Sequence, residues 1–147
     1  MDPEPFIATP FSERGAAFSH DGRLLAYVSN ESGLDEVYVT PFPGPGAKLP
    51  ISSNGGLQPV WSRRDNELFY RDGDRMMAVR VESDPLRGSP AEMLFEVSAS
   101  GSSDRNTPDY DVAPDGRFVM VVAEDQLQEI RVVLNWFDEL ERLVPVE

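Results

Sequence analysis

The sequence predicts an all-β fold in which a unit of paired strands occurs three times. Three observations predict it: an internal repeat, turn dipeptides within the repeat, and β-branched or aromatic residues between the turns. The three copies occupy residues 16–27, 59–70 and 110–120. In each copy a short apolar segment is followed by a tight polar turn and then by a second apolar segment, which is the pattern of a β-hairpin.

The turn inside each copy carries residues that tolerate an unusual backbone conformation. Asp21-Gly22 and Asp115-Gly116 are hairpin-turn dipeptides, because glycine adopts positive φ without a Cβ clash. Asp65-Asn66 stands in their place in the middle copy, and asparagine is the next most tolerant residue there. All three copies are therefore expected to turn tightly.

Further strands follow each hairpin. Third strands are expected at residues 36–39, 76–81 and 130–134, and outer strands at residues 48–51 and 92–95. Four strands in roughly forty residues, repeated, make a β-propeller blade. The chain is thus predicted to be one domain of three four-stranded-type blades, which span residues 15–52, 58–96 and 109–135.

Two segments lie outside this repeat. Residues 4–9 are expected to form a single strand that belongs to no blade, whereas the third blade lacks its outer strand. Residues 136–144 follow the third blade and are predicted to form a short amphipathic helix. Its apolar residues at helical spacing are Trp136, Phe137, Leu140, Leu143 and Val144.

The chain carries a formal net charge of −13, with 26 acidic residues and 13 basic ones. Such a surface repels phosphate backbones and anionic lipids, so neither nucleic acid nor a membrane is expected as a partner. The alternative use of this charge is an acidic cluster that holds a cation. The sequence has no cysteine, which excludes disulfides, zinc-thiolate sites and thiol catalysis.

Residues 1–5 are acidic and rich in proline, and they lack the basic and then apolar pattern of a secretory signal. No apolar run approaches the ~20 residues that a membrane-spanning helix needs. As given, the chain is expected to be cytoplasmic.

An open half-ring would expose core-type apolar faces at both ends, which soluble proteins seldom tolerate. Two copies related by a twofold axis would close a ring of six blades. The strand at residues 4–9 would then supply the missing outer strand of the partner's third blade. The alternative is that the chain is a piece of a longer protein that contributes the other blades.

Several short stretches carry a resemblance to a known family, at residues 18–23, 26–29, 31–33, 36–39, 41–44, 58–62, 106–108 and 135–137. They resemble the repeats of TolB-like propellers, which are similar to WD-repeat propellers. The resemblance is greatest to the C-terminal propeller half found behind bacterial serine/threonine kinase domains. Departures are His20, where proline is usual, and Asn66, where glycine is usual. The chain has no glycine-rich loop, His-Arg-Asp segment or Asp-Phe-Gly segment, so it is not a kinase by itself.

Propeller sites usually lie at one mouth of the central channel, where loops enter the inner strands. The residues expected at this mouth are Glu13, Arg14, Gln58, Arg105, Asn106 and Asp109. Glu13, Asn106 and Asp109 offer hard oxygen ligands that suit calcium or another divalent cation. The alternative is that these residues are only turn formers, because Asp, Asn and Gly favour turns for backbone reasons.

The leading functional prediction is a non-catalytic binding or assembly module that works as a homodimer or as part of a longer kinase-associated protein, with a small molecule or a peptide as a candidate partner. A third interpretation is a scaffold that docks peptides of other proteins. The alternative is a metal-dependent hydrolase with a lactonase-like or phosphotriesterase-like site at the channel mouth, by analogy of architecture alone. His20 is expected in an exposed turn at the opposite end, and not in a Ser-His-Asp triad. The aromatic residues expected in the core are Phe18, Tyr27, Trp61, Phe69 and Tyr70.

Overall fold

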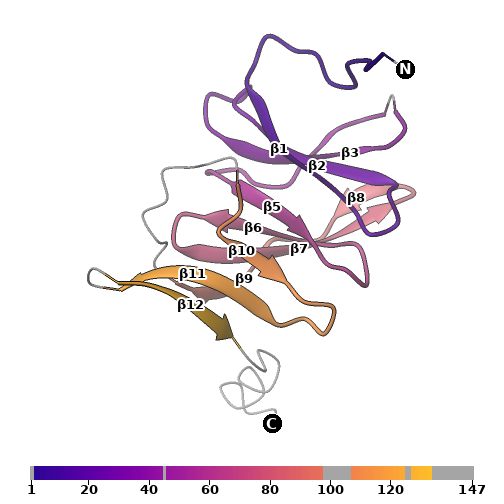
Figure 1. Ribbon diagram of the computed structural model, residues 1–147. Helices are drawn as coiled ribbons and strands as arrows, with labels where there is room; N and C mark the ends of the chain where they lie inside the picture. The colour runs from indigo at the N-terminus through magenta and orange to yellow at the C-terminus, as the bar shows by residue number, and fades with distance from the viewer. Residues whose placement is uncertain (1, 45, 98–106, 125–126, 134–147) are drawn as a thin grey trace.

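The computed structural model describes residues 2–44, 46–97, 107–124 and 127–133 (Figure 1). These residues form antiparallel sheets and contain no helix, so the all-β prediction is confirmed for the described part of the chain. Accordingly, no helix that could cross a membrane occurs in these residues. The helix expected at residues 136–144 lies outside the described residues.

The first sheet contains four strands in chain order, β1 (Glu13–Phe18), β2 (Leu24–Ser29), β3 (Glu36–Pro41) and β4 (Leu49–Pro50). The third sheet contains β10 (Tyr110–Val112), β11 (Phe118–Glu124) and β12 (Leu127–Val133), again in chain order. Each strand lies beside the strand that follows it in sequence, as short connections between antiparallel strands require.

The second sheet contains one strand more than expected. Its strands are β5 (Leu57–Trp61), β6 (Glu67–Asp72), β7 (Arg75–Ser83), β8 (Leu86–Gly88) and β9 (Glu92–Glu96). The four predicted strands are present as β5, β6, β7 and β9, and β8 is an additional short strand, because β7 is nine residues long and pairs with two strands. Residues 81–83, at the C-terminal end of β7, pair with β8, whereas residues 75–78 at its N-terminal end pair with β9.

The turn of the first hairpin is held by its own side chains. Gly22 has φ of 70°, and Gly116 in the third hairpin has φ of 87°, so both use the left-handed region. The Ser19 hydroxyl donates to Asp21 Oδ1 at 2.7 Å, and this bond holds the pKa of Asp21 below its usual value. Asn66 was expected to stand in for the turn glycine, but it does not have positive φ. Gln58 is the one described non-glycine residue that does.

The first strands of the first two sheets each contain a β-bulge, at the equivalent position. Pairing shifts between Arg14 and Ala17 in β1 and between Leu57 and Val60 in β5. The bulges contain Gly15, with φ of 62°, and Gln58, with φ of 56°, at equivalent positions. Glycine accepts this conformation readily, whereas glutamine does so at a cost of about 1 kcal/mol.

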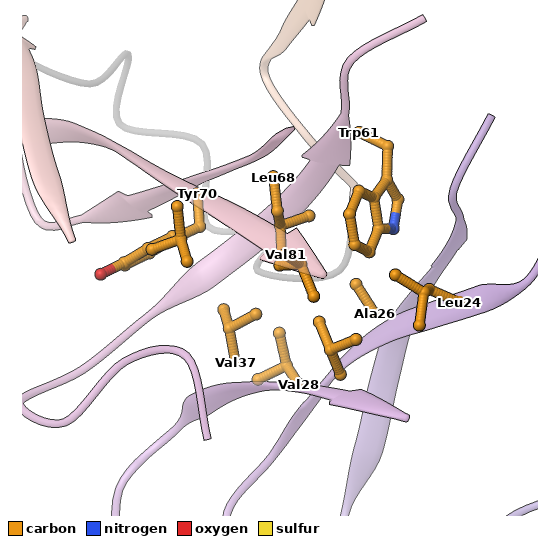
Figure 2. Close-up of a cluster of buried hydrophobic side chains, with 10 residues drawn as sticks. Leu24, Ala26, Val28, Val37, Trp61, Leu68, Tyr70 and Val81 are labelled. Carbon is orange, nitrogen blue, oxygen red and sulfur yellow. The ribbon is translucent and has the colours of Figure 1, made fainter. Parts of the chain in front are cut away.

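The three sheets stack face to face around two apolar cores (Figure 1). The first core joins one face of the first sheet to one face of the second, and Trp61, Leu68 and Tyr70 of the second sheet point into it (Figure 2). The second core joins the opposite face of the second sheet, which includes Phe69 and Met76, to the third sheet.

We call the face of a sheet that looks toward the preceding sheet its leading face, and the opposite one its trailing face. Trp61 and Leu68 lie on the leading face of the second sheet, and their equivalents by strand register are Phe18 and Leu25 in the first sheet. No sheet precedes the first one, so Phe18 is 53% exposed. The prediction that Phe18 is core is therefore wrong for the single chain, whereas Tyr27, Trp61, Phe69 and Tyr70 are buried as expected.

Residues 4–9 form no strand in this structure of one chain, and their pairing with a partner's third sheet stays a prediction. The segment lies over the leading face of the first sheet, where residues 5–9, Tyr27, Thr40 and Lys48 line a common cavity. The Phe6 ring packs edge-on against Phe42 at 5.1 Å between centroids. A strand needs a free sheet edge to pair with, and a sheet face offers none.

Tyr110 links the second and third sheets, and its removal tests how much this link stabilises the fold. Its buried hydroxyl donates to the Gln58 carbonyl oxygen at 2.7 Å. Tyr110→Phe is expected to lower the free energy of unfolding by about 1–2 kcal/mol, because the buried carbonyl loses its donor. Urea unfolding measures the change, with Tyr27→Phe on the first sheet as control. An equal decrease in the free energy of unfolding in both variants would contradict the role of Tyr110 as a link between the second and third sheets.

Candidate functional site

Glu13 and Arg14 begin β1 at the end of the first sheet where the channel mouth is expected. The Glu13 carboxylate accepts hydrogen bonds from Thr9 Oγ1 and, at 3.4 Å, from Ser29 Oγ. Arg14 forms an ion pair with Asp35, while its buried Nε has no hydrogen-bond partner in the part of the chain that the structure describes. Both side chains are thus engaged within the first sheet and its loops.

A negative potential surrounds this end of the first sheet. Burial raises the pKa of Tyr27 to about 12, and the charges of Glu31 and Glu13 add to this shift. Lys48 balances part of the charge, since it pairs with Glu31 and lies 5.4 Å above the centre of the Tyr38 ring. The only lysine in the sequence therefore pairs with an acidic residue of the loop between β2 and β3.

Gln58 and Asp109 are brought close together at the same end of the second and third sheets. Gln58 Nε2 donates to the Thr107 carbonyl oxygen at 3.0 Å, two residues before Asp109 in sequence. The Asp109 backbone oxygen accepts from Val121 N at 2.8 Å, and its buried Oδ1 has no hydrogen-bond partner among the described residues. The strained backbone of Gln58 is thus compensated by its bond to Thr107 and by the bond that its carbonyl oxygen accepts from Tyr110 of the third sheet.

The structure therefore brings together only part of the predicted mouth. Gln58 joins the segment around Asp109, while Glu13 and Arg14 bond within the first sheet. Arg105 and Asn106 lie outside the described residues. Within the described ranges, no group of three or more His, Asp or Glu side chains is placed to hold a metal ion. The cation site built on Glu13, Asn106 and Asp109 stays a prediction.

A buried carboxylate supports this end of the molecule. Glu36, the first residue of β3, accepts hydrogen bonds from the Ser52 hydroxyl and, at 3.0 Å, from Gly55 N. Ser52 Oγ also accepts from Val37 N at 2.8 Å, so one hydroxyl serves two buried groups. Because Gly55 leads into β5, this network positions the bulge that contains Gln58.

A second candidate site lies along the first strands of the three sheets. A hollow of about 480 Å³ is lined by residues 15–18 of β1, residues 59–61 of β5 and Asp111 of β10. His20 and Arg63 lie at its rim, and Arg63 forms an ion pair with Asp111 at 2.7 Å. Its volume falls within the range of about 300–1,000 Å³ that is usual for ligand sites.

This hollow is not predicted by the sequence pattern, which places the site at the opposite end of the strands. One signal was available: Asp111 is a charged residue in a first strand, where the other copies have Ala17 and Val60. A charge at such a position is unusual for a strand that packs into a core. The expectation that His20 lies in an exposed turn holds, but this turn borders the hollow.

Together, the described residues define an all-β chain of three stacked antiparallel sheets, whose first strands line one shared hollow. Neither a protein-family model nor a curated protein sequence matches this chain. The function proposed below therefore rests on the geometry of the chain itself.

Removal of the Ser52 hydroxyl tests the buried support beneath this end of the sheets. Ser52→Ala is expected to lower the free energy of unfolding by about 2–4 kcal/mol, since both Glu36 and Val37 N lose a partner in a buried site. Ser32→Ala is the matched control, because its hydroxyl bonds to Leu34 O in an exposed turn. Urea unfolding compares the two variants. A Ser52→Ala loss as small as that of the control would rule out the role assigned to Ser52.

Proposed function

We propose that this chain is a binding and assembly module, half of a TolB-like β-propeller, and that two copies close a ring of six blades. The observation that carries the proposal is the equivalence of sheet faces. Trp61, Leu68 and Tyr70 pack the second sheet on the first. Val112, Phe118 and Met120 occupy the same register positions in the third sheet and pack it on the second.

The two outer faces repeat the residue types of these two interfaces. The leading face of the first sheet presents Phe18, Leu25 and Tyr27, at the register positions of Trp61, Leu68 and Tyr70. The trailing face of the third sheet presents Val119, which is 36% exposed. Val119 pairs with Val132, and Val121 with Ile130, so apolar residues also occur at the paired positions of β12. A third interface of the same kind would join these two faces between copies.

The first strands of the sheets support the ring geometry. β5 contacts both β1 and β10, although these strands belong to three different sheets. In a propeller, the first strand of each blade lines the central channel. The hollow with His20, Arg63 and Asp111 would then face this channel, and we assign it as the place where a small molecule or a peptide binds.

Ring closure requires that residues 4–9 leave the leading face of the first sheet. The hollow of about 610 Å³ that residues 5–9 line is open to solvent, so they cover this face only in part. In the dimer, the freed segment would pair with the outer edge of the partner's third sheet, which has three strands in the described part. Edge strands accept such added strands readily.

The mass in solution tests the ring directly. Light scattering on a sizing column is expected to give twice the chain mass of 16.4 kDa at micromolar concentration. A specific dimer of this kind is expected to have a dissociation constant of ~1 μM or below. A protein that remains monomeric at a concentration of about 100 μM would therefore contradict ring closure by two copies.

A charge on the trailing face of the third sheet tests which surface closes the ring. Val119→Glu is expected to weaken the dimer at least about 30-fold, because it buries an unpaired charge in the interface. Met93→Glu is the matched control, since Met93 is 50% exposed on β9 at the outer side of the second sheet. Sedimentation equilibrium gives both dissociation constants. Equal constants in the two variants would show that Val119 lies outside the interface.

A further inference from the structure

One asparagine of this chain is followed by glycine, in the loop that leads into β5. The sequence contains five asparagines, and Asn54 is the only one that precedes a glycine. Asn54 is exposed, and its side chain makes no hydrogen bond to any described residue. Asparagine is thermolabile, and it loses its side-chain amide most easily before glycine, because glycine has no Cβ to hinder its own backbone nitrogen.

The reaction at such a pair is deamidation, which needs no enzyme. The Gly55 nitrogen gives up its proton to a base and attacks Cγ of Asn54, and the new N–Cγ bond closes a succinimide ring. The Cγ–Nδ2 bond breaks, and the amide group takes up a proton and leaves as ammonia. Water then opens the ring at either carbonyl carbon, which leaves aspartate or isoaspartate at position 54. The first step requires that the Gly55 N–H is free to lose its proton.

In this fold the Gly55 N–H is held by a buried carboxylate. Gly55 N donates to Glu36 Oε1 at 3.0 Å, and the other carboxylate oxygen accepts from the Ser52 hydroxyl. The next amide of the loop is held as well, because Gly56 N donates to Asp35 O at 2.9 Å. Glu36 is only 4% exposed, so water has little access to replace it as the acceptor.

The loop depends on this hydrogen bond for protection because its backbone requires glycine. Gly55 has φ of 114°, a conformation that residues with a Cβ rarely adopt. The negative charge of the carboxylate opposes removal of the amide proton. A charge-assisted hydrogen bond must also break before the nitrogen can turn toward Asn54.

We propose that Asn54 is a deamidation site that the fold keeps closed through the hydrogen bond from Gly55 N to Glu36. This inference does not rest on the proposed ring. The reaction would affect more than the loop, because isoaspartate lengthens the backbone just before the bulge that contains Gln58. The Gln58 side chain bonds to Thr107 O, so deamidated molecules are expected to lose part of the link between the second sheet and the segment before the third.

The rate of deamidation in the full chain tests the proposal. Trypsin cleaves after Lys48 and Arg63, so the peptide of residues 49–63 contains Asn54, and mass spectrometry follows its conversion in mildly alkaline buffer. We expect the folded chain to react at least about tenfold more slowly than the same chain unfolded in guanidinium chloride, because a hydrogen bond to a charged group must open first. Fragment ions separate the change at Asn54 from any change at Gln58.

Removal of the acceptor connects this protection to Glu36. Glu36→Ala leaves Gly55 N without its partner and is expected to raise the rate at Asn54 by about tenfold, close to that of the unfolded chain. Val112→Ala is the matched control, because it destabilises the chain by removing methyl groups from the second core and leaves the loop unchanged. Its rate should stay near that of the wild type.

Hydrogen exchange supplies a second measurement, which decides the question if Glu36→Ala does not fold. In the wild type the Gly55 amide proton exchanges only when the same hydrogen bond opens, so its protection should match the slowing of deamidation. Three results would overturn the proposal: deamidation of the folded chain as fast as that of the unfolded chain, equal acceleration by Glu36→Ala and Val112→Ala, or exchange of the Gly55 amide as fast as in the unfolded chain.

Discussion

The second sheet has apolar side chains on both of its faces, and the rest of the structure depends on covering both. Trp61, Leu68 and Tyr70 on one face, and Phe69 and Met76 on the other, are nearly inaccessible to solvent. Burial of one such side chain contributes about 1.5–3 kcal/mol, so neither face can be left in water without a large loss of stability. A sheet of this kind is stable only between two others, and the first and third sheets fill these places.

This two-sided burial also determines where polar groups can lie. The cores occupy the space between sheets, so charged side chains lie at the strand ends, in loops and on exposed positions of strands such as β7 and β9. At one end, Glu36, Ser52 and Gly55 form a buried network, and Gln58 bonds to the third sheet. Along the first strands, the Arg63–Asp111 ion pair connects the second and third sheets across the hollow. The candidate sites are consequences of how the sheets stack.

The same need to cover apolar sheet faces applies to the two outer faces of the stack. β2 is buried at all six positions, although only one face of the first sheet meets another sheet. Residues 5–9 cover part of its leading face, over a large hollow, while Phe18 at the rim remains exposed. A partly covered apolar face on the first sheet and an exposed valine on the third sheet are the features that favour closure by a second copy.

The strands were largely predictable from local pattern. The hairpin copies and their glycine turns follow from chain-local chemistry, because a turn with positive φ selects glycine wherever it lies. The extra strand β8 was not predictable, since Leu86–Gly88 is too short for a periodic signal and exists only because β7 runs on to meet it. Asn66 differs from Gly22 because its turn avoids the left-handed region altogether.

The sequence by itself determined the repeat, the antiparallel strands and the division between apolar and polar strand positions. Only the tertiary structure decided which predicted site residues meet: Gln58 bonds beside Asp109, while Glu13 and Arg14 bond within their own sheet. It also decided that Phe18 is exposed while its equivalent Trp61 is buried. The physical reason is that residues in equivalent strand positions have the same local geometry, but their burial depends on whether another sheet lies opposite them.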